Sequence, residues 1–187
     1  AKKTVDINGG EMLANAFNGS HGHILLDPTI LNLNSDDFTD GADKTFEADE
    51  RINVNGVTIS SRQVNGADHL NGDSIGDSGD LFFYAPEIIF NAGSKILTHG
   101  NNGFIGGFLV AQTTREVNEL SGDPIAVKVH VLDSILKGRS VDIAAYASVI
   151  KNTILNDVSS INMSAEVKIG NGTVIESERT LNIVSQL

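Results

Sequence analysis

The C-terminal part of the chain, residues 140–187, repeats against itself with a step of twenty residues. Three short segments carry the repeat: Ser140–Ile143, Ser160–Met163 and Thr180–Ile183. Apolar and polar side chains alternate within each segment, which is the two-residue period of a β-strand with one buried face. A fixed period near twenty residues, built from short strands, indicates stacked coils, and the parallel β-helix is the first candidate.

Stacked coils place equivalent residues directly above one another, about 4.8 Å apart. We therefore expect two internal apolar columns and one outward polar ladder. The members are Val141, Ile161 and Leu181 in the first column, Ile143, Met163 and Ile183 in the second, and Asp142, Asn162 and Asn182 in the ladder. A leucine-rich repeat would need a leucine-asparagine consensus, and a helical repeat an apolar spacing of three and four, and both are missing. The predicted fold is all-β, a right-handed parallel β-helix with coils of about 20 residues.

The chain is expected to form a single β-helix segment over residues 1–187. Three insertions should interrupt the coils: an acidic one at 34–50, a second one at 65–79 and a glycine-rich one at 98–125. Strand-like sequence stands near both termini, which predicts a segment of a longer repeat protein with strand edges open to pairing.

Composition excludes several classes of function. The net charge is −11, which disfavours binding to nucleic acid or to an anionic membrane. The chain contains no cysteine, so it has neither disulfides nor thiolate metal sites. No apolar run approaches the roughly 20 residues that span a bilayer, so membrane insertion is not expected.

Two stretches resemble a known family. Gly79–Ile88 (GDLFFYAPEI) and Arg51–Gln63, which starts RINV and ends SSRQ, are similar to coils of filamentous haemagglutinin-like adhesins. These are large repetitive exoproteins of bacterial surfaces and biofilm matrices. The resemblance implies a non-enzymatic structural or adhesive segment that lies outside the cell or on the bacterial surface. It also implies its partners: surface glycans or proteins of host or bacteria, matrix polysaccharide, and neighbouring repeats of the same protein.

The acidic loops suggest one cofactor, calcium. Asp73, Asp77 and Asp80 are spaced by four and three residues in a glycine-rich loop, and Ca²⁺ takes six to eight oxygen ligands. The spacing of an EF-hand is absent, as is the nonapeptide of calcium-binding toxins. A solvated loop without a metal is the alternative that we favour, and no other cofactor is expected.

The second hypothesis is a carbohydrate-active enzyme or a carbohydrate-binding module, because β-helices also carry polysaccharide lyases and hydrolases. Such enzymes need converging carboxylates with a nearby cation. The candidates are Asp133 and Asp142 with Lys128, and Asp27 with His23. Asp142 stands in a ladder with asparagines, so it supplies one carboxylate rather than a pair, and we expect no enzyme activity.

Histidines and phenylalanines leave two further questions. His21 and His23 could bind a transition metal, but no third ligand is near in sequence, and we interpret them as surface residues. Phe104 and Phe108, in the glycine-rich insertion, could form an exposed apolar patch. A plug for the core where the regular coil is interrupted is the interpretation that we prefer.

Overall fold

The computed structural model of the chain describes residues 4–8, 23–26, 28–117, 125–149 and 163–187. The described residues contain no helix, and their fifteen strands form two curled sheets. The six-stranded sheet consists, in order, of β1 (Thr4–Ile7), β3 (Ile30–Leu33), β6 (Arg51–Val54), β9 (Glu87–Phe90), β12 (Ile125–Val131) and β14 (Met163–Ile169). The expectation of an all-β chain is confirmed.

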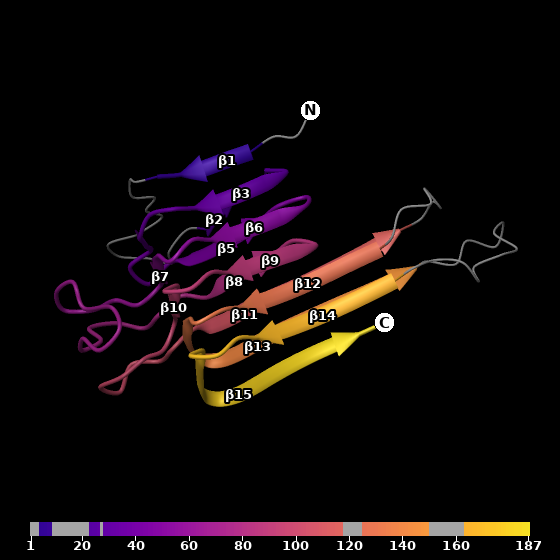
Figure 1. Cartoon of the computed structure of the whole chain (residues 1–187). Coiled ribbons are helices and arrows are strands. Elements are labelled where there is room, and N and C mark those ends of the chain that lie inside the picture. Colours follow the sequence, from indigo (N-terminus) through magenta and orange to yellow (C-terminus); the bar gives the residue numbers. More distant parts are fainter. Residues whose placement is uncertain (1–3, 9–22, 27, 118–124, 150–162) are drawn as a thin grey trace, which may run out of the picture.

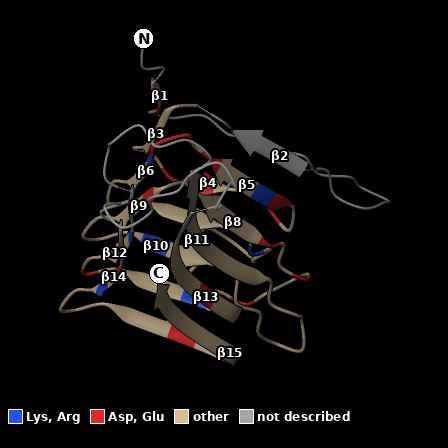
Figure 2. Cartoon of the chain, turned by 90° about the vertical axis from the view of Figure 1, so that its right-hand side faces the viewer, with Lys and Arg blue, Asp and Glu red and all other residues tan. Residues whose placement is uncertain are grey.

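The nine remaining strands make the second sheet. They are β2 (His23–Leu26), β4 (Asp37–Phe38), β5 (Asp43–Glu47), β7 (Thr58–Ser60), β8 (Leu81–Tyr84), β10 (Lys95–Leu97), β11 (Phe108–Val117), β13 (Ile135–Val149) and β15 (Val174–Gln186). Every pairing between named strands is parallel, as expected. The two sheets stand side by side in Figure 2, and the strands are layered from β1 at one end to β15 at the other (Figure 1).

The chain alternates regularly between the sheets, and we call each passage from one strand of the six-stranded sheet to the next a circuit. The circuit from Ile30 to its partner Arg51 takes 21 residues. The next three, to Glu87, Lys128 and Glu166, take 36, 41 and 38 residues. The predicted coil length of about 20 residues is therefore wrong for all but one of these circuits.

The twenty-residue repeat has a different meaning from the one its spacing suggested. Val141 does pair with Leu181, and Ile143 with Ile183, as the predicted columns require. Met163, however, pairs with Ile125 in the other sheet. A shift of twenty residues thus moves from one sheet to the other, because both sheets bury one face and so share the same alternation. Ile161 and Asn162 lie outside the described residues.

Apolar columns run through the space between the sheets. Alternate residues along a strand point inward and are buried. In β9, for example, Ile88 and Phe90 are buried, whereas Glu87 and Ile89 are only partly buried. Three columns of fully buried side chains run through the core: Leu31, Ile52, Ile88 and Val129; Leu33, Val54, Phe90 and Val131; and Leu81, Leu109 and Val141.

Asparagine side chains form a ladder at the corner that follows the six-stranded sheet. Nδ2 of Asn91 donates to Oδ1 of Asn55 at 2.8 Å, Asn55 to Asn34 at 2.6 Å, and Asn34 to Asn8 at 3.0 Å. The two inner amides, Asn55 and Asn34, each use the donor toward one circuit and the acceptor toward the next. The ladder therefore fixes the register between circuits whose loops differ in length.

The three expected insertions have different outcomes. Residues 34–50 contain β4 and β5, so this segment belongs to the sheet and is not a projecting loop. Residues 65–79 do lie between β7 and β8, with one isolated antiparallel bridge from Val64 to Ser74. The segment 98–125 contains β11, a ten-residue strand of the second sheet.

Candidate functional site

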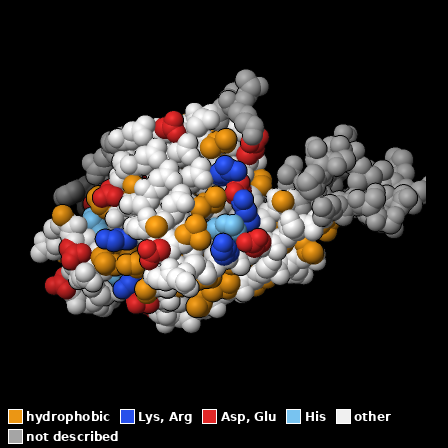
Figure 3. All heavy atoms as spheres, viewed as in Figure 1, with side chains coloured by type: hydrophobic (Ala, Val, Ile, Leu, Met, Phe, Trp, Pro, Cys, Tyr) orange, Lys and Arg blue, Asp and Glu red, His pale blue; other side chains and the backbone are white. Residues whose placement is uncertain are grey.

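Charged side chains of opposite sign alternate along the outer face of the six-stranded sheet. Register places Arg51, Glu87, Lys128 and Glu166 next to one another on successive strands. Nε of Arg51 donates to Glu87 at 2.6 Å, and Lys128 pairs with the other oxygen of the same carboxylate. His130 stands 2.8 Å from Glu166. Figure 3 shows charged and histidine side chains gathered on this face. We call these five residues the charged column.

Glu87 is the centre of the charged column. Partial burial raises the pKa of its carboxyl, but the hydrogen bonds and positive charges of Lys128 and Arg51 outweigh burial and hold that pKa below its usual value. The carboxylate is therefore ionised at neutral pH and fully engaged by two cations. Exposed pairs of this kind contribute about 0–1 kcal/mol each to stability.

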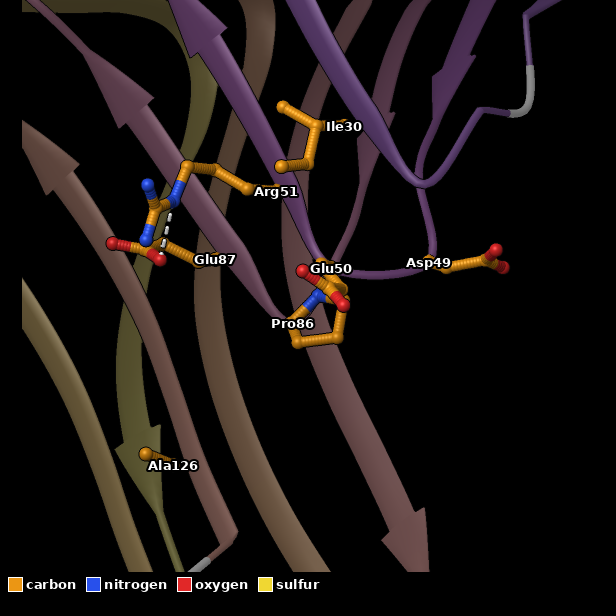
Figure 4. Close-up of a pocket in the computed structure, with 7 residues that line it drawn as sticks. All are labelled: Ile30, Asp49, Glu50, Arg51, Pro86, Glu87 and Ala126. Atoms are coloured by element: carbon orange, nitrogen blue, oxygen red, sulfur yellow. Dashed lines mark hydrogen bonds and ion pairs between the residues drawn. The ribbon is translucent and has the colours of Figure 1, made fainter. Parts of the chain in front are cut away.

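A hollow of about 430 Å³ lies beside the charged column, at the start of β6 and β9. Its lining residues are Ile30, Asp49, Glu50, Arg51, Pro86, Glu87 and Ala126. Figure 4 shows Arg51 and Glu87 turned toward each other and joined by their hydrogen bond, with Asp49 pointing away from them. The hollow thus combines carboxylates with the apolar side chains of Ile30 and Pro86, and carboxylates can accept hydrogen bonds from the hydroxyl or amino groups of a ligand.

Arg62, which the sequence did not single out, organises the loop after β7. Its guanidinium is buried and donates Nε to the carbonyl of His99 at 2.9 Å and Nη2 to the carbonyl of Gly72 at 2.8 Å. Nη1 donates to the carbonyl of His69. Burial lowers the pKa of Arg62, while the negative charges of Asp68 and Glu178 act in the opposite direction. The loop therefore folds around a single cation.

Two histidines accompany Arg62. The His69 ring stacks on Phe38, with centroids 4.0 Å apart, and its Nδ1 lies 3.1 Å from the Ser60 hydroxyl. Nε2 of His99 lies 3.1 Å from the Leu70 carbonyl, which can only accept, so Nε2 is the donor. Burial, reinforced by the charge of Arg62, lowers the pKa of His99 to about 4. Both rings hold the loop against the sheet.

A second buried cation, Lys44, lies inside the nine-stranded sheet. It pairs with Asp37, and both side chains are almost completely buried. The lysine also lies 5.2 Å from the centroid of the Phe46 ring. Oδ1 of Asp37 is buried without a hydrogen-bond partner among the described residues. The only signal in the sequence was a lysine within an acidic segment, which suggested a solvated loop.

The predicted calcium ligands occupy one loop but differ in surroundings. Asp73 is exposed. Oδ1 of Asp77 accepts the amide of Ile105 at 2.7 Å, and Oδ1 of Asp80 accepts the amide of Phe108 at 2.8 Å. Burial raises the pKa of Asp80, which the bond from Phe108 only partly offsets. Within the described ranges, no three carboxylate or imidazole side chains form a group that could hold a metal ion.

The catalytic candidates Asp142 and Lys128 are not brought together. Lys128 is in the six-stranded sheet, whereas Asp142 is in β13 of the other sheet. The Asp142 carboxylate accepts amides from Gln112 at 2.8 Å and from Asn182 at 3.0 Å. The contact with Asn182 is the part of the predicted outward ladder that can be seen. Asp133 is in the turn between β12 and β13, at a positive φ of 46°.

The remaining candidates divide between described and undescribed residues. His21 and Asp27 lie outside the described residues, and of His23 only the backbone is described. Phe104 and Phe108 are both exposed, beside the exposed Ile105. Our preferred interpretation of the two phenylalanines as a core plug is therefore wrong, because the inner face of β11 is filled instead by Leu109 and Ala111.

Comparison with protein-family models, with curated proteins and with solved structures finds no match for this chain. In the part of the chain that the structure describes, no helix is long and apolar enough to cross a membrane.

Proposed function

We propose that the chain winds as a right-handed parallel β-helix and serves as a non-enzymatic structural and adhesive segment of a secreted bacterial surface or biofilm-matrix protein. The observation that carries the proposal is the circuit itself. In β3, β4 and β5 the chain passes from the six-stranded sheet to two separate positions in the other sheet, and then returns beside its starting point. Parallel strands joined through crossovers are almost always connected in the right-handed sense.

The pattern of partners supports a structural role. Polar residues on the outer faces contact the equivalent residue of the next circuit, as the asparagine ladder and the charged column do. The Asp142 carboxylate is likewise held by two amides. Catalytic carboxylates, in contrast, need room for substrate and a second acid or base within reach. Side-chain contacts between successive circuits stiffen a stacked array, which suits the stalk of an adhesive protein.

The hollow beside the charged column is the surface that we assign to glycan or matrix contact. Asp49 and Glu50 on its rim are acidic, so an uncharged or amino-bearing polysaccharide suits it better than an acidic one. The same hollow supports the alternative function, a carbohydrate-binding module or a carbohydrate-active enzyme. Calcium bound by Asp73, Asp77 and Asp80 remains a separate proposal.

A binding assay with matched variants tests the proposal. Fluorescent protein is applied to immobilised neutral and amino-sugar polysaccharides. We expect binding that Asp49→Asn weakens and Glu47→Gln leaves unchanged, because both carboxylates are exposed but only Asp49 lines the hollow. Equal binding by both variants, or none by the wild type, would remove the hollow from the proposal.

A turnover assay separates the alternative. The protein is incubated with acidic and neutral polysaccharides while unsaturated products and reducing ends are followed. No product is expected. Turnover that disappears in Asp142→Asn would show an enzyme and overturn the structural proposal.

A further inference from the structure

Within the described residues, both ends of the layered strands are sheet edges that no further strand pairs. Among the described strands, β1, β2 and β4 have an unpaired edge at one end of the sheets, and β14 and β15 at the other. In Figure 1, β1 and β15 lie at opposite extremes of the layered strands. Each outer strand therefore has one row of backbone amides and carbonyls that no described strand pairs, which is a template for strand addition.

Apolar side chains of the core columns come to the surface at the β14–β15 edge. Ile169, Leu181 and Ile183 are 41%, 48% and 43% exposed. Their partners one circuit earlier, Val131, Val141 and Ile143, are at most 1% exposed. The opposite edge shows the same feature, since Val5 of β1 is 40% exposed. Both edges would bury apolar surface if another strand were added in the same register.

The register of the six-stranded sheet shows which strand would fit. Each column runs from β1 through β3, β6, β9 and β12 to β14. If β1 of a second copy were added next to β14 in the same register, Val167, Lys168 and Ile169 would each pair with the residue that begins their own column. Those residues are Val5, Asp6 and Ile7. Apolar residues therefore face apolar residues, and a lysine faces an aspartate.

The second sheet gives the same answer. By backbone register, the columns that end at Leu181 and Ile183 begin at Ile24 and Leu26 of β2. The positions in these columns again carry apolar residues at both ends. The columns that begin at β1 and those that begin at β2 thus agree on one partner, the β1–β2 edge of an identical molecule.

We propose that copies of this chain stack end to end, with the β14–β15 edge of one copy paired in parallel with the β1–β2 edge of the next. The contact joins different surfaces of the two copies, so it does not close and it generates linear chains of molecules. The inference goes beyond adhesion, because it concerns the sheet edges and not the outer face that carries the hollow.

Cysteine cross-linking tests the register directly, because the chain has no cysteine of its own. Asp6→Cys and Lys168→Cys are made in separate proteins of different mass and mixed under mild oxidation. Neighbouring Cα atoms of paired strands are about 5 Å apart, within the range of a disulfide. We expect the mixed dimer in several-fold excess over either homodimer. Asn8→Cys is the register control, since two residues along the strand add roughly 7 Å.

A charge exchange provides an independent readout by sedimentation velocity. Wild-type protein should form a concentration-dependent series of oligomers. Lys168→Glu or Asp6→Lys alone should weaken association about fivefold, and the double variant should recover it, because the pair is restored in reverse. Lys95→Glu is the matched control, as Lys95 lies on β10 between paired strands.

Three results would overturn the proposal. Wild-type protein that stays monomeric at millimolar concentration has no such contact. A preference for Lys168→Cys homodimers would show that two β14–β15 edges pair with each other instead. Equal cross-linking of Lys168→Cys with Asp6→Cys and with Asn8→Cys would show association without the inferred register. Thermal melting of each variant confirms that it is folded before it is compared.

Discussion

Lys44 and Asp37 place an ion pair where the columns of the nine-stranded sheet otherwise carry apolar residues. Register puts Lys44 in the same column as Leu81, Leu109 and Val141. A buried ion pair gains little over an apolar pair, but removing one partner leaves a charge without compensation. The other buried cation, Arg62, has no carboxylate hydrogen-bonded to it among the described residues and instead donates hydrogen bonds to the backbone carbonyls of His69, Gly72 and His99.

The first prediction concerns this ion pair. Lys44→Met should lower the free energy of unfolding by about 3–5 kcal/mol, because the carboxylate of Asp37 is then buried alone. The double variant with Asp37→Asn should lose clearly less than the sum of the two single changes. Urea denaturation measures all three proteins. Additive losses would show that the two side chains do not interact.

The second prediction concerns pH. His99 stays neutral in the folded protein down to a pKa of about 4, whereas in the unfolded chain it becomes protonated near pH 6.5. The unfolded state therefore binds more protons between pH 6.5 and 4, and stability falls as pH falls through this window. Burial also lowers the pKa of His69, which acts in the same direction.

His99→Gln isolates this effect, because glutamine keeps a side-chain N–H for the Leu70 carbonyl but does not titrate. The melting temperature of the wild type should decline more steeply than that of the variant from pH 6.5 to 4, with parallel curves above pH 7. Identical slopes throughout would mean that His99 titrates normally in the folded protein.

At the scale of elements, each strand depends on the strict alternation of its two faces. Ile88 and Ile89 are adjacent in β9, but Ile88 is fully buried in the core and Ile89 faces outward between Asn53 and His130. The same residue type therefore has two different surroundings within one strand. The six-stranded sheet repeats this arrangement on its neighbouring strands.

The third prediction compares these neighbours. Ile88→Asp should cost more than about 4 kcal/mol, since it buries an unpaired carboxylate. Ile89→Asp should cost less than about 1 kcal/mol, because its carboxylate reaches water and His130. Chemical denaturation of the two variants under one set of conditions gives the comparison. A similar loss in both would contradict the assignment of inner and outer faces.

At the scale of the whole molecule, negative charge accumulates on one chain with few cations to offset it. The net charge is −11. Residues 65–80 contribute four aspartates and no lysine or arginine, and Arg62, just before this segment, is buried. Physiological salt screens exposed charges over about 8 Å, which relieves the repulsion only in part. A divalent cation would relieve it directly.

The fourth prediction is the calcium test. Millimolar Ca²⁺ should raise the melting temperature by a few degrees, since extracellular sites bind at about 10⁻⁴ to 10⁻³ M. The double change Asp73→Asn with Asp77→Asn should reduce the rise. Sodium chloride at matched ionic strength is the control, and an equal rise with it would mean that the loop is only acidic.

The sequence by itself determined the type of structure: all-β, parallel and stacked, with Val141 and Ile143 assigned correctly to the inner face. These features are local, because a strand with one buried face must alternate every two residues. The outward Asp142 and its contact with Asn182 followed from the same alternation.

Only the tertiary structure decided which strands are neighbours and which polar residues are buried. Val141 lies beside Leu181 and Met163 beside Ile125, because loops of unequal length carry the chain to different sheets while every strand keeps the same alternation. Arg62 is buried because carbonyls of His69, Gly72 and His99 converge on it from two separate segments. Such convergence depends on contacts distant in sequence, and no local pattern records it.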